Sequence, residues 1–200
     1  GYVFPNETTL CEQLHIGRTS LREAYKALEL SGFITRTKRG THVNERGDIL
    51  RAAPLRALFT DADRNDFSEF RRMLEIECAG LAATSADDED IASLETHNDA
   101  CATANSERHY RDLFYADMSF HQTVALMSGN RLFIDISSVM HEALEQSVLD
   151  NFLATLERDP GFFDRTIEQH AHIIDTIRAH DAQEARQAMA SHLDAVSKPA

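Results

Sequence analysis

The strongest constraint on the fold lies between residues 66 and 196, where apolar residues recur every three or four positions along six successive stretches. This spacing places apolar side chains on one face of a helix, and the strict alternation of a half-buried strand is scarce here. Each helix must bury its apolar stripe against a neighbour, so this part of the chain is predicted to form an all-α bundle. The predicted helices cover residues 66–84, 87–104, 107–128, 131–155, 161–179 and 182–196.

Four polar residues fall on the apolar stripes of the third, fifth and sixth predicted helices. A single inward histidine is usually a hydrogen-bonded core residue, but three histidines and a carboxylate from three helices need another explanation. Each would be desolvated without a partner, which costs on the order of several kcal/mol for a charged group. Because one divalent cation can supply the missing partner for all four, we predict a metal site. Its predicted ligands are Asp117, His121, His170 and His192.

The types of ligand restrict the metal and leave room for a further molecule. Three imidazoles and one carboxylate suit zinc, with nickel and manganese as alternatives. Four protein ligands leave open positions on an octahedral ion, where a hydroxy acid or sugar acid could chelate it. Arg71 is predicted to face inward and to pair with a carboxylate, the alternative being a surface salt bridge with Glu75. His141 shares an apolar stripe and is predicted to line the same cavity.

The first fifty residues have a different pattern. They are predicted to form a helix that starts at Asn6 or Pro5, a second helix over 19–30, and a β-hairpin whose turn is at 37–40. Gly17 is expected to take the positive φ of the turn between the helices, and Gly32 is expected to end the second helix. Two helices followed by a short basic hairpin are typical of a winged helix-turn-helix.

The second of these helices carries a basic stripe opposite its apolar face, because three cationic residues recur every four positions. Hydroxyls at the helix start can meet phosphate together with the free backbone N–H groups. Such a helix fits the major groove, where arginine can donate two hydrogen bonds to guanine. The alternative, a solvated amphipathic helix beside a surface turn, is not excluded by spacing alone. The candidate DNA-contacting residues are Arg18, Thr19, Ser20, Arg22, Lys26, Arg39 and Gly40.

Charge is divided unevenly along the chain, although the total is −13. Residues 1–56 hold nine Lys and Arg against six Asp and Glu, whereas residues 57–200 hold eleven against twenty-seven. A mildly basic head can meet phosphates that would repel an acidic body. The two parts of the chain, residues 1–56 and 57–200, are therefore predicted to have different functions.

Motifs in the head keep a common register over about 45 residues, and they resemble the winged helix-turn-helix of the GntR family of regulators. The resemblance implies that Arg18, Thr19, Ser20 and Arg22 contact an operator, with Gly40 in the wing. In two respects the chain departs from the family pattern. Thr8 stands where members usually have Arg, and the helix that normally precedes this segment is expected to be missing. The matching motifs are Phe4-Pro5-Asn6-Glu7, Glu12-Gln13-Leu14, Arg18-Thr19-Ser20-Leu21-Arg22-Glu23-Ala24, Leu28-Glu29-x-x-Gly32 and Arg39-Gly40-Thr41-x-Val43.

The helical part resembles the FCD effector domain of the FadR-like branch of that family. The resemblance implies that the four predicted ligands hold a divalent metal and that the carboxylate of an effector completes its coordination. It also implies a homodimer, and we assign Arg71, Asn130 and His141 to effector binding. The motifs that carry it are Asp117-x-x-x-His121, His170-x-x-Ile173-x-x-x-Ile177, Met189-x-x-His192-Leu193, Phe70-Arg71-Arg72-x-Leu74-Glu75 and Ser128-Gly129-Asn130.

Three functions fit these observations. The leading hypothesis is a transcriptional regulator, a repressor, whose response to a sugar acid or hydroxy acid changes its binding to operator DNA. A metal-dependent enzyme is the second hypothesis, but no HExxH-like arrangement supplies a base, so we predict that the chain is not an enzyme. The third is a DNA-binding protein with a purely structural metal.

The predicted organisation follows from these motifs. A winged helix-turn-helix covers residues 1–50, a linker covers 51–65, and an all-helical effector-binding and dimerisation domain covers 66–196. No apolar run approaches the ~20 residues of a membrane span, and no export leader opens the chain. Three cysteines without metal-like spacing are expected to be reduced thiols. A cytoplasmic protein that does not contact a membrane is therefore predicted.

Overall fold

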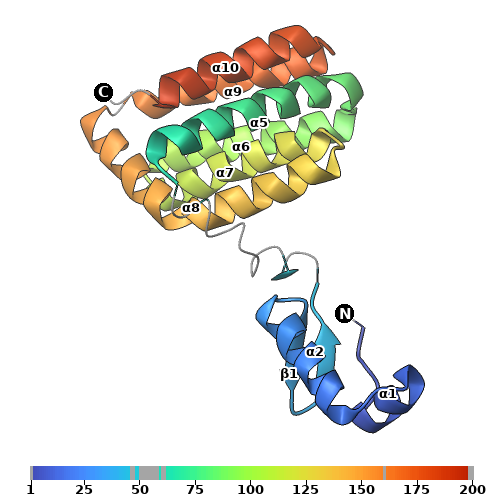
Figure 1. The fold of residues 1–200 in the computed structure, drawn as a ribbon. Coiled ribbons are helices and arrows are strands. Elements are labelled where there is room, and N and C mark those ends of the chain that lie inside the picture. Colours follow the sequence, from blue (N-terminus) through green and yellow to red (C-terminus); the bar gives the residue numbers. More distant parts are fainter. Residues whose placement is uncertain (1, 46–47, 50–58, 60–61, 160, 198–200) are drawn as a thin grey trace. The chain divides into compact units, whose positions relative to one another are not determined.

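The structure is a computed structural model of the chain, and it describes residues 2–45, 48–49, 59, 62–159 and 161–197. The chain divides into two compact units, Gly1–Asp61 and Ala62–Ala200 (Figure 1). The predicted linker at 51–65 falls mostly outside the described residues. No helix in the described ranges is both long and apolar enough to cross a membrane.

The first unit has the predicted helix-turn-helix and hairpin. Asn6 caps the first helix, because its side-chain oxygen accepts a hydrogen bond from the Thr9 N–H at 3.0 Å. The antiparallel strands pair residue by residue from Ile34 with Val43 to Thr37 with Gly40. The helices and strands are α1 (Glu7–Leu14), α2 (Arg18–Leu30), β1 (Ile34–Thr37) and β2 (Gly40–Val43).

One local prediction in this unit is wrong. His15, and not Gly17, takes the left-handed conformation after α1, with φ of 54°. Its backbone N–H bonds the carbonyls of the last turn of the helix, so His15 is a C-cap. Gly17 instead has φ of −74° and stands as the N-cap of α2. The prediction for Gly32 is confirmed, since it follows α2 with φ of 73°.

A small core holds this unit together. Leu10 of α1, Leu21 and Tyr25 of α2 and Ile34 of β1 form a buried cluster, with Phe4 and Cys11 packed against it. Burial of these four residues from three elements fixes the two helices and the hairpin relative to one another. The residues of the basic stripe on α2 remain exposed.

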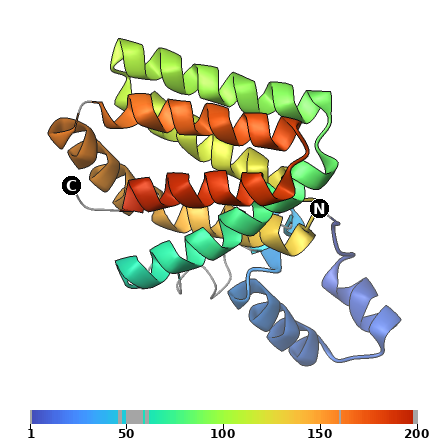
Figure 2. The same cartoon turned by 90° about the horizontal axis from the view of Figure 1, so that it is seen from above.

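The second unit is the predicted all-α bundle, and each of the six predicted helices is present (Figure 2). Helix α5 packs against α7, α9 and α10, and α6 packs against α7 and α9. Helices α9 and α10 also pack against each other, so α5, α9 and α10 are in mutual contact. The helices are α5 (Arg64–Ser85), α6 (Asp88–Glu107), α7 (Tyr110–Met127), α8 (Arg131–Arg158), α9 (Phe162–Arg178) and α10 (Ala182–Ser197).

Candidate metal centre

Three histidines from three helices converge inside the bundle. His121 lies on α7, His170 on α9 and His192 on α10, and one ring nitrogen from each lies within 4.8 Å of the others. The Nε2 atoms of His121 and His192 are 3.2 Å apart. Two ligands of one zinc ion, each about 2.0–2.1 Å from the metal, lie roughly 2.8–3.4 Å apart at octahedral or tetrahedral angles. The spacing of the His121 and His192 nitrogens therefore suits a shared ion, and His170 lies close enough to be a third candidate ligand.

Asp117 lies at the edge of this group. It is one helical turn before His121 on α7, and its Oδ1 is 3.5 Å from His170 Nε2. Its side chain is 15% exposed, and burial raises the pKa of its carboxyl. The structure thus places Asp117 beside His170, while the group of side chains close enough to share an ion consists of the three histidines.

His170 gives the strongest indication that this site could bind a metal ion. The residue is fully buried, and neither of its ring nitrogens has a hydrogen-bond partner among the described residues. Its ring stacks on Phe120, with the ring centres 3.9 Å apart and the planes 8° from parallel. An unpartnered buried polar atom costs about 1–3 kcal/mol, and a metal ion bound to Nε2 would remove that cost for one nitrogen. The donor set therefore fits a divalent cation.

The protonation state of the histidines points the same way. Burial lowers the pKa of His170 and of His192 well below the usual range, and the charge of neighbouring histidines lowers both further. Both rings are therefore neutral at neutral pH. Metal binding requires this form, because a protonated imidazole has no lone pair to donate.

A glutamine orients one of these rings and another orients a nearby histidine. The Nδ1 of His192 is 3.1 Å from Gln169 Oε1, and the Nδ1 of His141 is 3.2 Å from Gln122 Oε1. Since an amide oxygen only accepts hydrogen bonds, the Nδ1 of His192 carries the proton of this neutral ring. The Nε2 lone pair of His192 consequently faces the other histidines, as a ligand nitrogen must.

Sequence reasoning missed the part played by Glu75, a residue of α5 that is only 1% exposed. Its Oε2 lies 2.7 Å from His121 Nδ1, a close contact without the alignment of a full hydrogen bond. Arg71 Nε donates to its Oε1 at 2.7 Å, and His141 Nε2 is 3.5 Å from the same oxygen. A carboxylate behind a ligating histidine fixes the ring and raises its basicity.

Glu75 is ionised despite its burial. Burial alone would raise the pKa of its carboxyl, but the charges of Arg71 and His121 and the contacts with His121 and His141 hold that pKa well below the usual range. Arg71 thus faces inward, and its ion pair with Glu75, which was the alternative at the surface, is present but buried, since the two side chains are 18% and 2% exposed. The chain therefore carries a buried charged network next to the histidines.

Removing this carboxylate tests its role. We expect Glu75→Gln to weaken zinc binding by about 10- to 100-fold, because the orientation of His121 loses its anionic support. A competition titration against a chromophoric chelator measures the affinity. Glu69→Gln is the matched control, since Glu69 lies on the same helix but is exposed. Equal zinc affinity in the two variants would show that Glu75 does not support the site.

The predicted DNA-contacting residues lie together in the first unit. Five of them, at positions 18, 19, 20, 22 and 26, are on α2, and all five are exposed. Arg39 and Gly40 lie at the turn of the hairpin, where Gly40 has φ of 130°, a conformation that favours glycine. These positions fit a recognition helix and a wing.

Comparisons with known proteins agree with both units. The FCD domain profile matches residues 66–195. The HTH-type transcriptional regulator YcbG of Bacillus subtilis is 30% identical over 195 residues, which cover 96% of this chain and 78% of YcbG. The chain is a FadR-like member of the GntR family of transcriptional regulators. It is accordingly a DNA-binding regulator and not an enzyme.

Further relatives of this GntR-family regulator support the assignment. A putative L-lactate dehydrogenase operon regulatory protein of Escherichia coli K12 is 30% identical over 203 residues, covering 98% of this chain and 77% of that protein. The solved structure of a Streptococcus agalactiae GntR protein matches with a TM-score of 0.74 at 23% identity, over 98% of this chain and 89% of that one. The latter similarity supports the fold.

Asn130 has a structural task in the FCD domain. It caps α8, and its side-chain oxygen accepts hydrogen bonds from the N–H groups of Leu132 at 3.1 Å and Phe133 at 3.4 Å. This capping accounts for an asparagine at the start of the helix. Its role in effector binding stays a prediction, whereas Arg71 and His141 both contact Glu75 next to His121.

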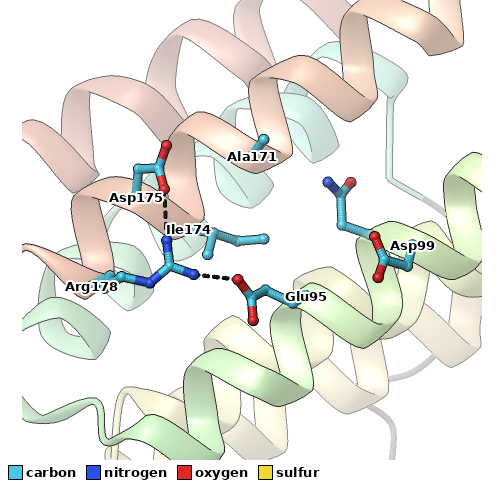
Figure 3. Close-up of a pocket in the computed structure, with 7 residues that line it drawn as sticks. Glu95, Asp99, Ala171, Ile174, Asp175 and Arg178 are labelled. Carbon is cyan, nitrogen blue, oxygen red and sulfur yellow. Dashed lines mark hydrogen bonds and ion pairs between the residues drawn. The ribbon is translucent and has the colours of Figure 1, made fainter.

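A groove of about 400 Å³ lies elsewhere on the FCD domain, between α6 and α9 (Figure 3). Arg178 of α9 bridges Asp175 on its own helix and Glu95 on α6, so part of the acidic lining is already neutralised. None of the predicted site residues lines this groove. Its lining residues are Glu95, Asn98, Asp99, Ala171, Ile174, Asp175 and Arg178.

Proposed function

We propose that this regulator senses a small carboxylate through a divalent metal held by Asp117, His121, His170 and His192. The observation that carries the proposal is the fully buried His170, which lies beside two other imidazoles and whose two nitrogens have no hydrogen-bond partner among the described residues. Zinc suits a site of three imidazoles and one carboxylate. When bound, the metal supplies Lewis acidity toward an oxygen ligand.

The effector class follows from what such a site can bind. A hydroxy acid or sugar acid offers a carboxylate and a neighbouring hydroxyl, which together can chelate an ion that has open positions. One relative is named for the L-lactate dehydrogenase operon, which supports an α-hydroxy acid as effector. Arg71 and His141 both contact Glu75 next to His121, and they are proposed to contact the effector.

The output of the sensor is operator binding by the first unit. GntR-family regulators bind DNA, and the exposed basic face of α2 suits the major groove. We propose a homodimer whose two heads read the halves of a symmetric operator, with the effector favouring an arrangement that binds this operator less well. In this scheme the regulator is a repressor.

A thermal melt of the full chain tests the sensor. We expect zinc to raise the melting temperature of the metal-free protein, since a ligand that binds only the folded state stabilises it by about 2.7 kcal/mol at 100 times its Kd. For a chain of this length that corresponds to roughly 5–10 °C. Lactate and a series of hexonates and hexuronates are then screened with zinc and with EDTA.

The pattern of shifts separates the possible outcomes. A further rise with one of these acids that disappears in EDTA supports chelation of the effector by the metal. A rise that persists in EDTA places the acid at a site without metal and contradicts the proposal. A zinc shift with no response to any acid favours a purely structural metal, and the absence of a zinc shift removes the metal site.

A further inference from the structure

Two arginines of the first unit share one carboxylate. Glu7, at the start of α1, accepts a hydrogen bond from Arg22 Nε to its Oε2 at 3.0 Å and from Arg36 Nη2 to its Oε1 at 2.9 Å. Arg22 lies on the basic face of α2, and Arg36 lies on β1. One side chain of α1 therefore links the candidate recognition helix to the hairpin.

The hydrogen bond from Arg22 Nε to Glu7 leaves the outer edge of the Arg22 guanidinium available for a further partner. Its Nε is engaged with Glu7, and the rest of its exposed guanidinium offers two N–H groups along the outer edge. Two parallel hydrogen bonds to guanine need this edge in a fixed plane. A carboxylate that holds Nε fixes the plane, because the guanidinium is a rigid fork.

Glu7 is itself anchored on its other side. The guanidinium of Arg36 lies over the ring of Tyr25, 5.3 Å from its centre, and Tyr25 is only 2% exposed. The first turn of α1 also meets the next arginine of the stripe, because Arg18 Nη2 donates to Thr8 Oγ1 at 3.1 Å. Thr8, which departs from the family pattern, thus contacts an arginine of the predicted interface.

The carboxylate of Glu7 lies beside the candidate DNA-contacting residues, where its negative charge lowers the affinity for DNA. Phosphates repel it, so Glu7 weakens the sequence-independent part of DNA binding, which is electrostatic. A negative charge placed there is favourable for readout only if it improves the match to one sequence over others. The contact with Arg22 is the means by which it can do so.

We propose that Glu7 is a positioning residue for DNA readout, which holds the Arg22 guanidinium in the plane needed to recognise one operator base pair. The inference rests on the proposed reading of DNA by Arg22. Glu7 thereby exchanges general affinity for discrimination between the operator and other duplexes.

The test compares Glu7→Gln with Glu12→Gln in the full chain. Glu12 is an exposed residue of the same helix without a contact to any cation among the described residues, so both variants remove one negative charge from α1. The probes are a duplex selected from a random library by the unaltered chain and a duplex of arbitrary sequence. Both variants are expected to bind the arbitrary duplex more tightly by a similar factor. Only Glu7→Gln is expected to bind the selected duplex less well, about tenfold relative to Glu12→Gln.

Single base-pair changes in the selected duplex separate positioning from a merely structural role. Glu7→Gln is expected to reduce the loss of affinity that a change at one base pair causes, and to leave the losses caused by changes at the other base pairs as they are. An equal loss at every position, or behaviour identical to Glu12→Gln on both duplexes, overturns the inference. If Arg22→Ala leaves binding of the selected duplex unchanged, the proposed DNA reading by Arg22 fails, and the inference fails with it for that separate reason.

A second variant keeps the test decisive if Glu7→Gln melts at a lower temperature. Arg36→Gln releases the carboxylate from the hairpin while it keeps the charge of Glu7 and its contact with Arg22. We expect a smaller loss of affinity for the selected duplex, centred on the same base pair. A penalty profile that matches the unaltered chain in this variant contradicts the anchoring of Glu7 by Arg36 and overturns the inference.

Discussion

Replacing His170 with leucine is expected to abolish zinc binding while it leaves the metal-free protein at least as stable as before. The imidazole is fully buried and its two nitrogens have no hydrogen-bond partner among the described residues. Each such atom costs about 1–3 kcal/mol in the metal-free fold. Leucine removes that cost and fills a similar volume against Phe120, so only the metal-bound state loses stability.

The measurements are zinc content after dialysis and the melting temperature with and without zinc. Unaltered chains are expected to retain one zinc ion each and to melt higher with the metal, whereas the leucine variant does neither. His172→Leu is the control, since His172 lies two residues along the same helix with its side chain 58% exposed. Retention of a full equivalent of zinc by the His170 variant would contradict the metal site. A large fall in the melting temperature of its metal-free form would contradict the account of unpartnered nitrogens.

The helices of the FCD domain could be predicted because their apolar spacing is a local property of the sequence. The third helix was predicted over 107–128 and spans Tyr110–Met127, and the sixth was predicted over 182–196 and spans Ala182–Ser197. Inward-facing polar residues could be identified by the same spacing, since His170 and His192 share stripes with residues that the structure buries. The apolar periodicity thus predicts both the helix and the face of that helix on which a candidate metal ligand lies.

Glu75 shows what such reasoning cannot supply. The sequence places it four residues after Arg71, so an ion pair between them could be predicted, but its burial could not. Contacts with His121 of α7 and His141 of α8 depend on how three helices pack, and no spacing within α5 carries that information. The pKa of Glu75 also depends in part on other helices, because burial raises it, whereas Arg71 of α5, His121 of α7 and His141 of α8 lower it.

The turn between α1 and α2 was mispredicted for a different reason. Glycine is the residue that adopts positive φ most readily, so Gly17 was the natural choice. The structure gives that conformation to His15, the C-cap, whose backbone N–H donates to the carbonyls of Cys11 and Glu12. The hydrogen bonds that end α1 outweigh the intrinsic preference of a single residue, since the orphan carbonyls of the last turn need donors.

Loss of Arg18 and Arg22 together is expected to weaken binding to the selected operator duplex by about 100-fold or more. Both are exposed on α2, whereas Leu21 and Tyr25 of the same helix are buried in the core of the first unit. Alanine at these two positions therefore leaves that core intact, while it removes both guanidiniums from the predicted groove-facing stripe. Fluorescence anisotropy at one fixed salt concentration measures the affinity, because the electrostatic part of binding changes steeply with salt.

The control must remove the same charge from elsewhere in the chain. Arg111→Ala with Arg158→Ala does so on α7 and α8 of the FCD domain, at exposed positions. If affinity depended only on net charge, both double variants would weaken binding equally, and the head would not be the DNA-reading unit. A loss confined to the α2 variant, together with a relaxed preference for the selected duplex over one of arbitrary sequence, locates base recognition on the exposed face of α2.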